Sequence, residues 1–234
     1  MKKHSVLVII PAKARSTRIP GKNLKDLCGK PMMAYIIETA KSARGVDRVI
    51  VTTESDEIKK VAERYGAEVP FIRPQELTSD AATSQEVLVH ALDELKAREG
   101  YEPEYVLLLY PTSPLLSRER VEQAIALAVE KDADSVVSGH YDKGHYWIQD
   151  DGAWKRLYPI KLVNSQYQQP LFKENGAIYM TCVSILRKQK QLLADRVQVL
   201  LMEPDENIDV DYPEDFALAE EILRRKSVRK VPNI

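Results

Sequence analysis

Short apolar runs alternate along the chain with longer segments whose apolar residues recur at helical spacing. Apolar runs of about four to eight residues are typical of buried strands, and a period of about 3.6 residues is typical of helices that cover a sheet. The predicted strands are residues 5–11, 48–53, 69–72, 105–110, 135–138, 177–180 and 195–202. The predicted helices are residues 31–43, 56–65, 84–98, 117–131 and 213–225.

This alternation of strand, loop and helix predicts an α/β fold with a doubly wound, mostly parallel sheet covered by helices. Ligands of such sheets bind beyond the carboxyl ends of the strands. The loops at residues 12–29, 77–83 and 111–116 are therefore the first places to look for a functional site.

The segment from residue 140 to residue 173 interrupts the alternation. It is rich in Tyr, Gln and Trp and has no long helical period. We interpret it as strands and loops inserted into the α/β frame. The prediction is therefore a core of residues 1–139 and 174–234 with an inserted arm of residues 140–173.

Composition narrows the class of protein. The 234 residues include 34 Lys and Arg against 35 Asp and Glu, a net charge of -1 that argues against a broad nucleic-acid-binding face. No apolar run is long enough to predict a membrane span. Cys28 and Cys182 lack metal-ligand or redox spacing, so we expect no disulfide framework. These features predict a cytoplasmic protein with neither a nucleic-acid nor a membrane partner.

Four cations follow the first predicted strand: Lys13, Arg15, Arg18 and Lys22. Small residues between them allow the backbone to approach a ligand closely, and backbone N–H groups together with cations suit a polyphosphate. The loop is neither a Walker sequence nor a GxGxxG sequence. The alternative is a solvated basic loop without a ligand.

Asp209 and Asp211 alternate with apolar residues near the end of the chain. In an extended segment, residues two apart project to the same face, so both carboxylates could reach one hard cation such as Mg²⁺. The alternative is that these acids cap the helix that follows.

Five segments, spread in order along the chain, carry recognisable motifs. They are IIPAKARSTRIPGKNLKDLCGKPMMAYIIETA (9–40), RPQELTSD with Thr83 and Ser84 (73–84), PTSPL (111–115), NGAIY (175–179) and IDVDYPEDF (208–216). The set resembles the acylneuraminate cytidylyltransferase family, whose members make CMP-activated sialic acids and related nonulosonic acids.

The resemblance implies a Rossmann-like nucleotidyltransferase fold in which the inserted segment is a dimerisation arm, and hence a homodimer. It implies an N-acylneuraminate cytidylyltransferase-like enzyme. Such an enzyme transfers CMP from CTP to the anomeric hydroxyl of a nonulosonic keto sugar acid and releases pyrophosphate. The implied cofactor is Mg²⁺, bound by Asp209 and Asp211.

The resemblance also assigns site residues. Those implied in catalysis are Lys22, Asp209 and Asp211. Those implied in CTP binding are Ala12, Lys13, Arg15, Ser16, Asn23, Arg73, Asp80, Thr83 and Ser84. Those implied in acceptor binding are Tyr110, Pro111, Thr112, Ser113, Gln166, Asn175 and Tyr179.

The chain departs from the family pattern around the acceptor. Tyr110 and Leu116 stand where many members have Gln and Arg, and the RQxLP-type segment before NGAIY lacks its arginine. A substrate carboxylate favours a cationic partner, so the sugar acid itself stays open. The alternatives are a 3-deoxy-octulosonate cytidylyltransferase and a catalytically silent nucleotide-binding scaffold of the same fold.

Overall fold

A six-stranded sheet with strand order β10-β6-β9-β5-β1-β4 forms the centre of the protein. The computed structural model describes residues 4–229, so the ends of the predicted core, residues 1–3 and 230–234, lie outside the described residues. The strands of this sheet are β1 (Val6–Pro11), β4 (Arg48–Thr52), β5 (Tyr105–Leu109), β6 (Ser135–Asp142), β9 (Leu171–Cys182) and β10 (Val197–Leu201).

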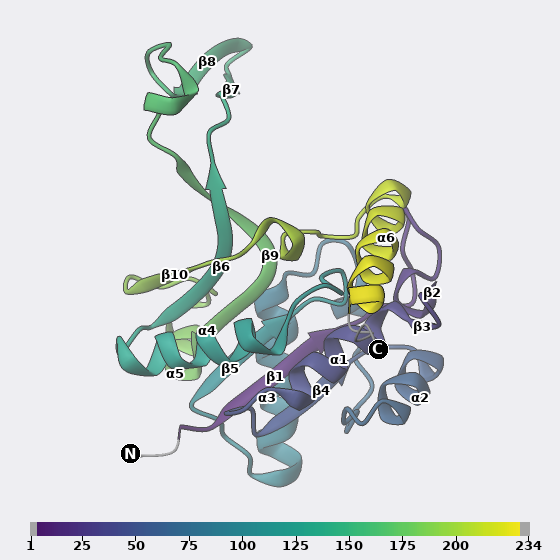
Figure 1. Cartoon of the computed structure of the whole chain (residues 1–234). Helices are drawn as coiled ribbons and strands as arrows, with labels where there is room; N and C mark the ends of the chain where they lie inside the picture. Colours follow the sequence, from purple (N-terminus) through teal and green to yellow (C-terminus); the bar gives the residue numbers. More distant parts are fainter. Residues whose placement is uncertain (1–3, 230–234) are drawn as a thin grey trace.

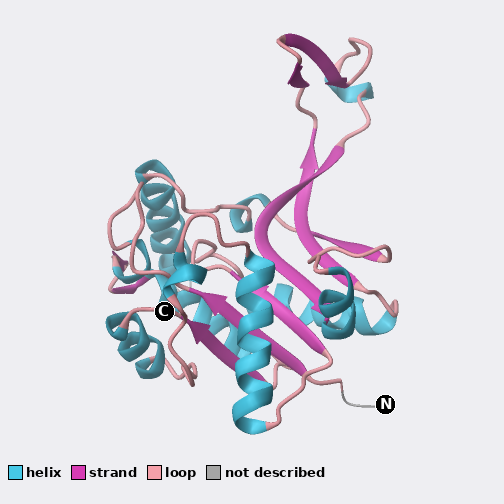
Figure 2. Ribbon diagram, turned by 180° about the vertical axis from the view of Figure 1, so that it is seen from behind, coloured by secondary structure: helices cyan, strands magenta, loops and turns pink. Residues whose placement is uncertain are grey.

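Helices cover both faces of the sheet (Figure 2). They are α1 (Met32–Ser42), α2 (Asp56–Arg64), α3 (Ser84–Glu99), α4 (Arg118–Glu130), α5 (Val183–Gln189) and α6 (Pro213–Arg229). Alternate residues of β1 enter two separate cores: Val8 packs with residues of α1, α2 and α4, whereas Leu7 packs with residues of α3 and α5. A strand buried on both faces explains why its sequence is continuously apolar.

The sheet is mixed but mostly parallel. β1 is parallel to β4 and β5, and β10 is parallel to β6, whereas β9 runs antiparallel to both β5 and β6. The predicted fold class is therefore confirmed. The carboxyl ends of β1, β4 and β5 lie at one edge of the sheet, and the loops that follow them meet there.

One predicted element is wrong, and one element was not predicted. Residues 69–72 form no strand: an isolated bridge between Ile50 and Glu68 lies just before the segment, and Pro70 has no N–H to extend the ladder. The predicted strand at residues 177–180 is confirmed as part of the longer β9, whereas α5 after it was not predicted. Five residues of α5 are at least partly exposed, so its apolar pattern is short and weak.

The inserted segment forms an arm that projects away from the sheet (Figure 1). β6 and β9 extend beyond the core as a two-stranded ribbon, and β7 (Tyr146–Asp150) pairs with β8 (Ala153–Tyr158) at its far end. The register shifts between Val137 and Gly139, where a Cβ on Gly139 would lie 2.2 Å from the carbonyl oxygen of Lys173, so only glycine fits.

The arm exposes many large apolar side chains. They are Tyr141, Trp147, Ile148, Trp154, Leu157, Ile160, Leu162, Val163 and Tyr167. The remaining short elements are β2 (Asp26–Leu27), β3 (Lys30–Pro31) and the 3-10 helices η1 (Lys22–Leu24), η2 (Gln75–Thr78), η3 (Ser165–Tyr167) and η4 (Pro204–Glu206). Within residues 4–229, no helix has the length and apolar character needed to span a bilayer.

Candidate active site

A cleft of about 550 Å³ opens at the carboxyl edge of the sheet. Its walls come from the loop after β1, the segment around η2, the start of α3, the loop after β5 and the segment before α6. The predicted site residues that line it are Lys13, Arg15, Ser16, Lys22, Asn23, Arg73, Asp80, Ser84, Tyr110, Pro111, Thr112 and Asp211. The predicted residues that are not part of its lining are Ala12, Thr83, Ser113, Gln166, Asn175, Tyr179 and Asp209.

Hydrogen bonds to β4 and within the loop hold the loop after β1 in place. The Ala12 N–H donates to the carbonyl of Thr52 at 3.0 Å and continues the β1–β4 pairing by one residue. Gly21 has a φ of +63°, which favours glycine, and it starts the 3-10 turn η1. The side-chain amide of Asn23 donates to the carbonyl of Lys13 at 2.9 Å, so Asn23 closes the loop on itself.

Lys22 joins this loop to the distant acidic segment. Its Nζ donates to the carbonyl of Val210 at 2.7 Å and to Oδ1 of Asp211 at 3.0 Å. Arg18 donates to Oδ2 of the same carboxylate at 2.6 Å. Folding therefore brings the cations and the carboxylate into direct contact across the cleft.

The environments of the two acidic side chains move their pKa values in opposite directions. Asp209 is open to solvent on one side but surrounded by protein on the others. This desolvation raises its pKa, although a hydrogen bond with Thr112 acts in the opposite sense. Burial alone would raise the pKa of Asp211 too, but hydrogen bonds and charge from Lys22 and Arg18 outweigh it and lower that pKa.

Arg73 reaches the cleft from the other side and is paired with Glu54, a residue that sequence reasoning missed. Their side chains lie 3.0 Å apart and are almost completely buried. Burial lowers the pKa of the Arg73 guanidinium, and Glu54 opposes that shift. The other oxygen of Glu54 accepts from the Ala14 N–H at 2.7 Å. Its position directly after a predicted strand, at the ligand-binding edge, was the signal that could have identified it.

Three predicted CTP-binding residues, Asp80, Thr83 and Ser84, lie at or just before the start of α3. Lys13 Nζ lies 2.6 Å from Oδ1 of Asp80, and this hydrogen bond lowers the pKa of the exposed carboxyl. Thr83 is the N-cap of α3 and forms a capping box with Glu86, which explains its absence from the lining. Ser84 lies one residue further on and faces the cleft.

Two tyrosines form the side of the site nearest the arm. The Tyr110 hydroxyl is hydrogen-bonded to the hydroxyl of Ser84, and its ring packs edge-on against Tyr179 with 6.5 Å between centroids. The Tyr179 hydroxyl donates to Glu174 at 2.8 Å. Desolvation and the Glu174 carboxylate raise the pKa of Tyr179, so this phenol is a hydrogen-bond donor at neutral pH.

Besides Tyr179, three predicted acceptor residues are not part of the cleft lining. Ser113 is buried, with no hydrogen-bond partner for its hydroxyl among the described residues. The amide of Asn175 is buried and hydrogen-bonded within the protein. Gln166 belongs to η3 in the arm.

The described part of the chain holds no cluster of three or more Asp, Glu, His or Cys side chains arranged to bind a metal ion. A metal site at the cleft would therefore rest on the two carboxylates of Asp209 and Asp211. The oxygen atoms of this pair suit a hard cation that takes its other ligands from water and phosphate.

A doubly wound sheet whose carboxyl edge carries cations and carboxylates around one cleft has the features of an enzyme that binds a nucleoside polyphosphate. A family model described as "Cytidylyltransferase" matches residues 7–226. The chain belongs to this cytidylyltransferase family. The predicted kinship with the acylneuraminate and other nonulosonate enzymes and the prediction of a CTP-dependent nucleotidyltransferase are both confirmed.

The curated relatives differ in how much of their length the chain matches. The CMP-N,N'-diacetyllegionaminic acid synthase of Legionella pneumophila is 29% identical over 93% of this chain and 96% of its own length. The N-acylneuraminate cytidylyltransferase of Escherichia coli is 31% identical over 97% of this chain, which spans 54% of that protein. A pseudaminic acid cytidylyltransferase of Campylobacter jejuni is 40% identical over 50% of each chain.

Solved structures support the fold. A CMP:2-keto-3-deoxy-manno-octonic acid synthetase complexed with CTP aligns with a TM-score of 0.71 at 18% identity, over 95% of this chain and 99% of that one. A 4-diphosphocytidyl-2C-methyl-D-erythritol synthase from Anaerococcus prevotii aligns with a TM-score of 0.67 at 18% identity, over 96% of this chain and 100% of that one.

Proposed function

We propose that this protein transfers CMP from CTP to the anomeric hydroxyl of a nonulosonic keto sugar acid and releases pyrophosphate. The observation that carries the proposal is the cleft in which Lys22 contacts Asp211, at the carboxyl edge of the sheet of a cytidylyltransferase. The relatives that span most of this chain have names that describe transfer to such acids. Transfer to 3-deoxy-octulosonate is the alternative, supported by a relative 41% identical over 51% of this chain.

In this reaction the acceptor hydroxyl attacks the α-phosphorus of CTP, and the bond to the leaving pyrophosphate breaks. Positioning and charge neutralisation carry most of the catalysis of such transfers. Lys22 would neutralise the α-phosphate, since its ammonium group is held at the cleft by two oxygens of the acidic segment. Lys13, Arg15 and Ser16 would hold the departing pyrophosphate from the loop after β1.

The base and the acceptor would occupy neighbouring parts of the cleft, which meet where the hydroxyls of Ser84 and Tyr110 are hydrogen-bonded. Arg73, Asp80 and Ser84 line the part near α3, where the resemblance implies recognition of CTP. Tyr110 and Thr112 line the part near β5, and Tyr179 packs against Tyr110 there. These side chains offer hydroxyl groups to a polyhydroxylated acceptor.

Mg²⁺ is the cofactor that the carboxylate pair fits. Asp209 and Asp211 would hold it, and it would add positive charge next to the phosphates of CTP. In the protein alone, Arg18 and Lys22 occupy the oxygens of Asp211, so these cations compensate the carboxylate charge.

The arm would join two copies of the chain into a homodimer. It extends from the core and exposes Trp154 to 68% and Ile160 to 83%, and exposed apolar patches of this kind mark interaction sites. We also propose a cytoplasmic location. The free thiols of Cys28 and Cys182 are consistent with a reducing compartment.

The test is a pyrophosphate-release assay with CTP, Mg²⁺ and a panel of acceptors: N-acetylneuraminate, legionaminate, pseudaminate and the eight-carbon octulosonate. Turnover with one of the nine-carbon acids is the expected result. Turnover only with the octulosonate would favour the alternative enzyme. No turnover with any acceptor, although CTP binds, would favour the silent scaffold. ATP, GTP and UTP replace CTP as controls for recognition of the base.

A further inference from the structure

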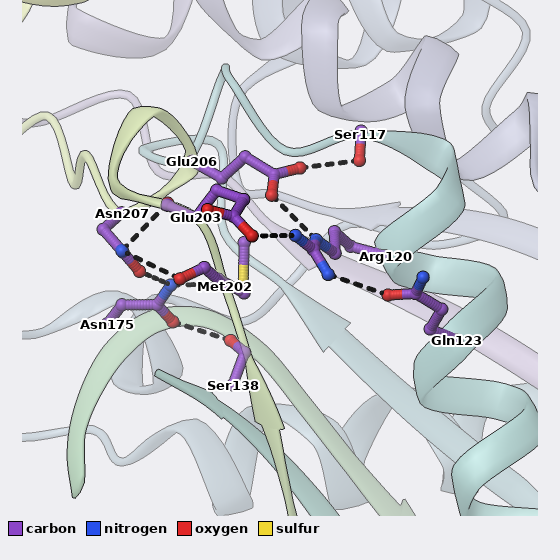
Figure 3. Close-up of polar contacts among 9 residues, drawn as sticks. All are labelled: Ser117, Arg120, Gln123, Ser138, Asn175, Met202, Glu203, Glu206 and Asn207. Atoms are coloured by element: carbon purple, nitrogen blue, oxygen red, sulfur yellow. Dashed lines mark hydrogen bonds and ion pairs between the residues drawn. The ribbon is translucent and has the colours of Figure 1, made fainter. Parts of the chain in front are cut away.

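A largely buried polar network fastens the segment at residues 203–211 to the rest of the core (Figure 3). Glu206, in η4, is the centre of its first half. One oxygen of Glu206 accepts from the Ser117 hydroxyl at 2.7 Å, and the other accepts from Nε of Arg120 at 2.7 Å. Both donors belong to the beginning of α4, so this carboxylate ties the segment to one end of that helix.

Arg120 makes two further contacts at the same place. Its second guanidinium nitrogen donates to Gln123 at 3.0 Å, and a third lies 3.7 Å from the carboxylate of Glu203. The side chains of Arg120 and Glu206 are only 18% and 10% exposed. Removing one partner of a pair so shielded from water leaves an uncompensated charge, so the pair holds its geometry firmly.

Asn207 forms the second half of the network and ties the same segment to the sheet. Its side-chain nitrogen donates to the carbonyl of Glu203 at 2.9 Å, and its oxygen accepts from the amide of Asn175 at 2.8 Å. The oxygen of Asn175 in turn accepts from the Ser138 hydroxyl at 2.6 Å. These contacts link the segment to β9 and β6, so it is held from two sides.

The carboxylate pair follows directly after these anchors. Asp209 is two residues beyond Asn207, and a Cβ built on Gly176, next to Asn175, would lie 3.6 Å from its Oδ2. The Val210 N–H then donates to the carbonyl of Thr112 at 2.8 Å. The chain between the network and the cleft is therefore too short to absorb a shift of η4 without moving the carboxylates.

We propose that Arg120, acting through Glu206, is a positioning residue for the carboxylates of Asp209 and Asp211. It contacts neither the cleft nor any reacting atom. It sets the path of the segment so that Asp211 reaches the cleft beside Lys22, with Asp209 two residues before it. The role in catalysis rests on the proposed function, whereas the control of the path of the segment is a property of the protein alone.

The chain contains a matched control for this role. Arg48, the first residue of β4, also lies between two glutamates, Glu68 and Glu99, and its side chain is 19% exposed. It lies at the amino end of its strand, at the edge of the sheet opposite to the cleft. Replacing Arg48 should therefore break an ion-pair cluster, as replacing Arg120 does, but without disturbing residues 203–211.

The experiment compares Arg120→Met, Glu206→Gln and Arg48→Met with the parent protein. Hydrogen exchange of residues 207–212 should become about ten-fold faster in Arg120→Met, because local opening of this segment then costs less free energy. In Arg48→Met the exchange of the same residues should stay unchanged. The Mg²⁺ concentration for half-maximal pyrophosphate release should rise about 10- to 100-fold in Arg120→Met, as for other partners that orient metal-binding side chains. Glu206→Gln keeps an acceptor for Ser117 and should give a smaller change in the same direction.

Unchanged exchange and unchanged Mg²⁺ dependence in folded Arg120→Met would overturn the proposal, as would equal effects in Arg48→Met. Should Arg120→Met fail to fold, Glu206→Gln decides by the same two measurements. Hydrogen exchange needs no acceptor. If no sugar acid is turned over by the parent, the proposed function fails while the exchange data still decide whether Arg120 positions the segment.

Discussion

Nζ of Lys22 lies 3.0 Å from Oδ1 of Asp211, although 189 residues separate the two along the chain. The lysine comes from the loop after β1 and the aspartate from the segment before α6. The contact joins the two groups that the proposed reaction needs at the α-phosphate, a cation and a carboxylate. It also means that a ligand enters a site whose charges are already paired with one another.

Replacing Lys22 by alanine should lower kcat/KM for CTP by roughly 100- to 1,000-fold, the usual cost of losing one charge-stabilising donor in the transition state. The physical reason is that the Lys22 side chain is only 12% exposed and its charge is directed at the cleft. Pyrophosphate release measures the effect. Lys25→Ala is the matched control, because Lys25 does not line the cleft and packs over Phe216. Equal losses in the two variants would contradict the role of Lys22.

In protein freed of metal with EDTA, replacing Asp209 or Asp211 by asparagine should change the melting temperature in opposite directions. The pKa of Asp211 is lowered in the fold, so its ionised form stabilises the protein at neutral pH and this stability is lost as the pH falls through that pKa. The pKa of Asp209 is raised, so its ionised form destabilises the fold at neutral pH. At pH 7.5, Asp211→Asn should lower the melting temperature and Asp209→Asn should raise it.

Calorimetry across a range of pH tests these signs, and the difference between each variant and the parent should shrink as the parent carboxylate becomes protonated. Both variants should lose the proposed transferase activity, because each lacks one of the two anionic oxygen donors. A variant that retains full activity at low Mg²⁺ would show that its carboxylate is not needed for the metal.

Breaking the pair between Glu54 and Arg73 should cost stability. Glu54→Leu leaves a buried guanidinium without its partner, for which the expected loss is about 3–5 kcal/mol of unfolding free energy. Urea unfolding measures the loss. The double variant Glu54→Leu with Arg73→Met should recover much of it, because no unpaired charge then remains buried. A double variant as unstable as Glu54→Leu alone would contradict this explanation.

Weakening the apolar surface of the arm should shift the proposed homodimer towards monomer. Trp154→Ser, alone or with Trp147→Ser, removes aromatic area of the kind that dominates protein interfaces. Analytical ultracentrifugation over a range of concentrations measures the change in mass. Ile72→Ser is the control, since Ile72 is also exposed but lies outside the arm. A parent protein that stays monomeric at every concentration would refute the homodimer.

Sequence and structure agree best where local chemistry decides the outcome. The apolar runs of β1 and β5 and the helical spacing of α3 predicted these elements. The spacing of apolar residues within one element is a local property that consecutive residues show directly. The helix predicted at residues 56–65 begins as α2 at Asp56, and the side chain of Ser55 before it is the N-cap that accepts from the Ile58 N–H. The prediction failed at residues 69–72, where Val69 and Phe71 bury their side chains without extending the strand ladder.

The sequence by itself determined the class of fold, the cation-rich loop and the alternating acids Asp209 and Asp211, because each depends on residue types at short spacing. Only the tertiary structure decided which of these groups meet. It paired Arg18 and Lys22 with Asp211, assigned Glu54 to Arg73, and directed the Asn175 amide into a network with Asn207. Such contacts depend on how strands far apart in the chain are ordered in the sheet. That order does not follow from any local pattern of residues.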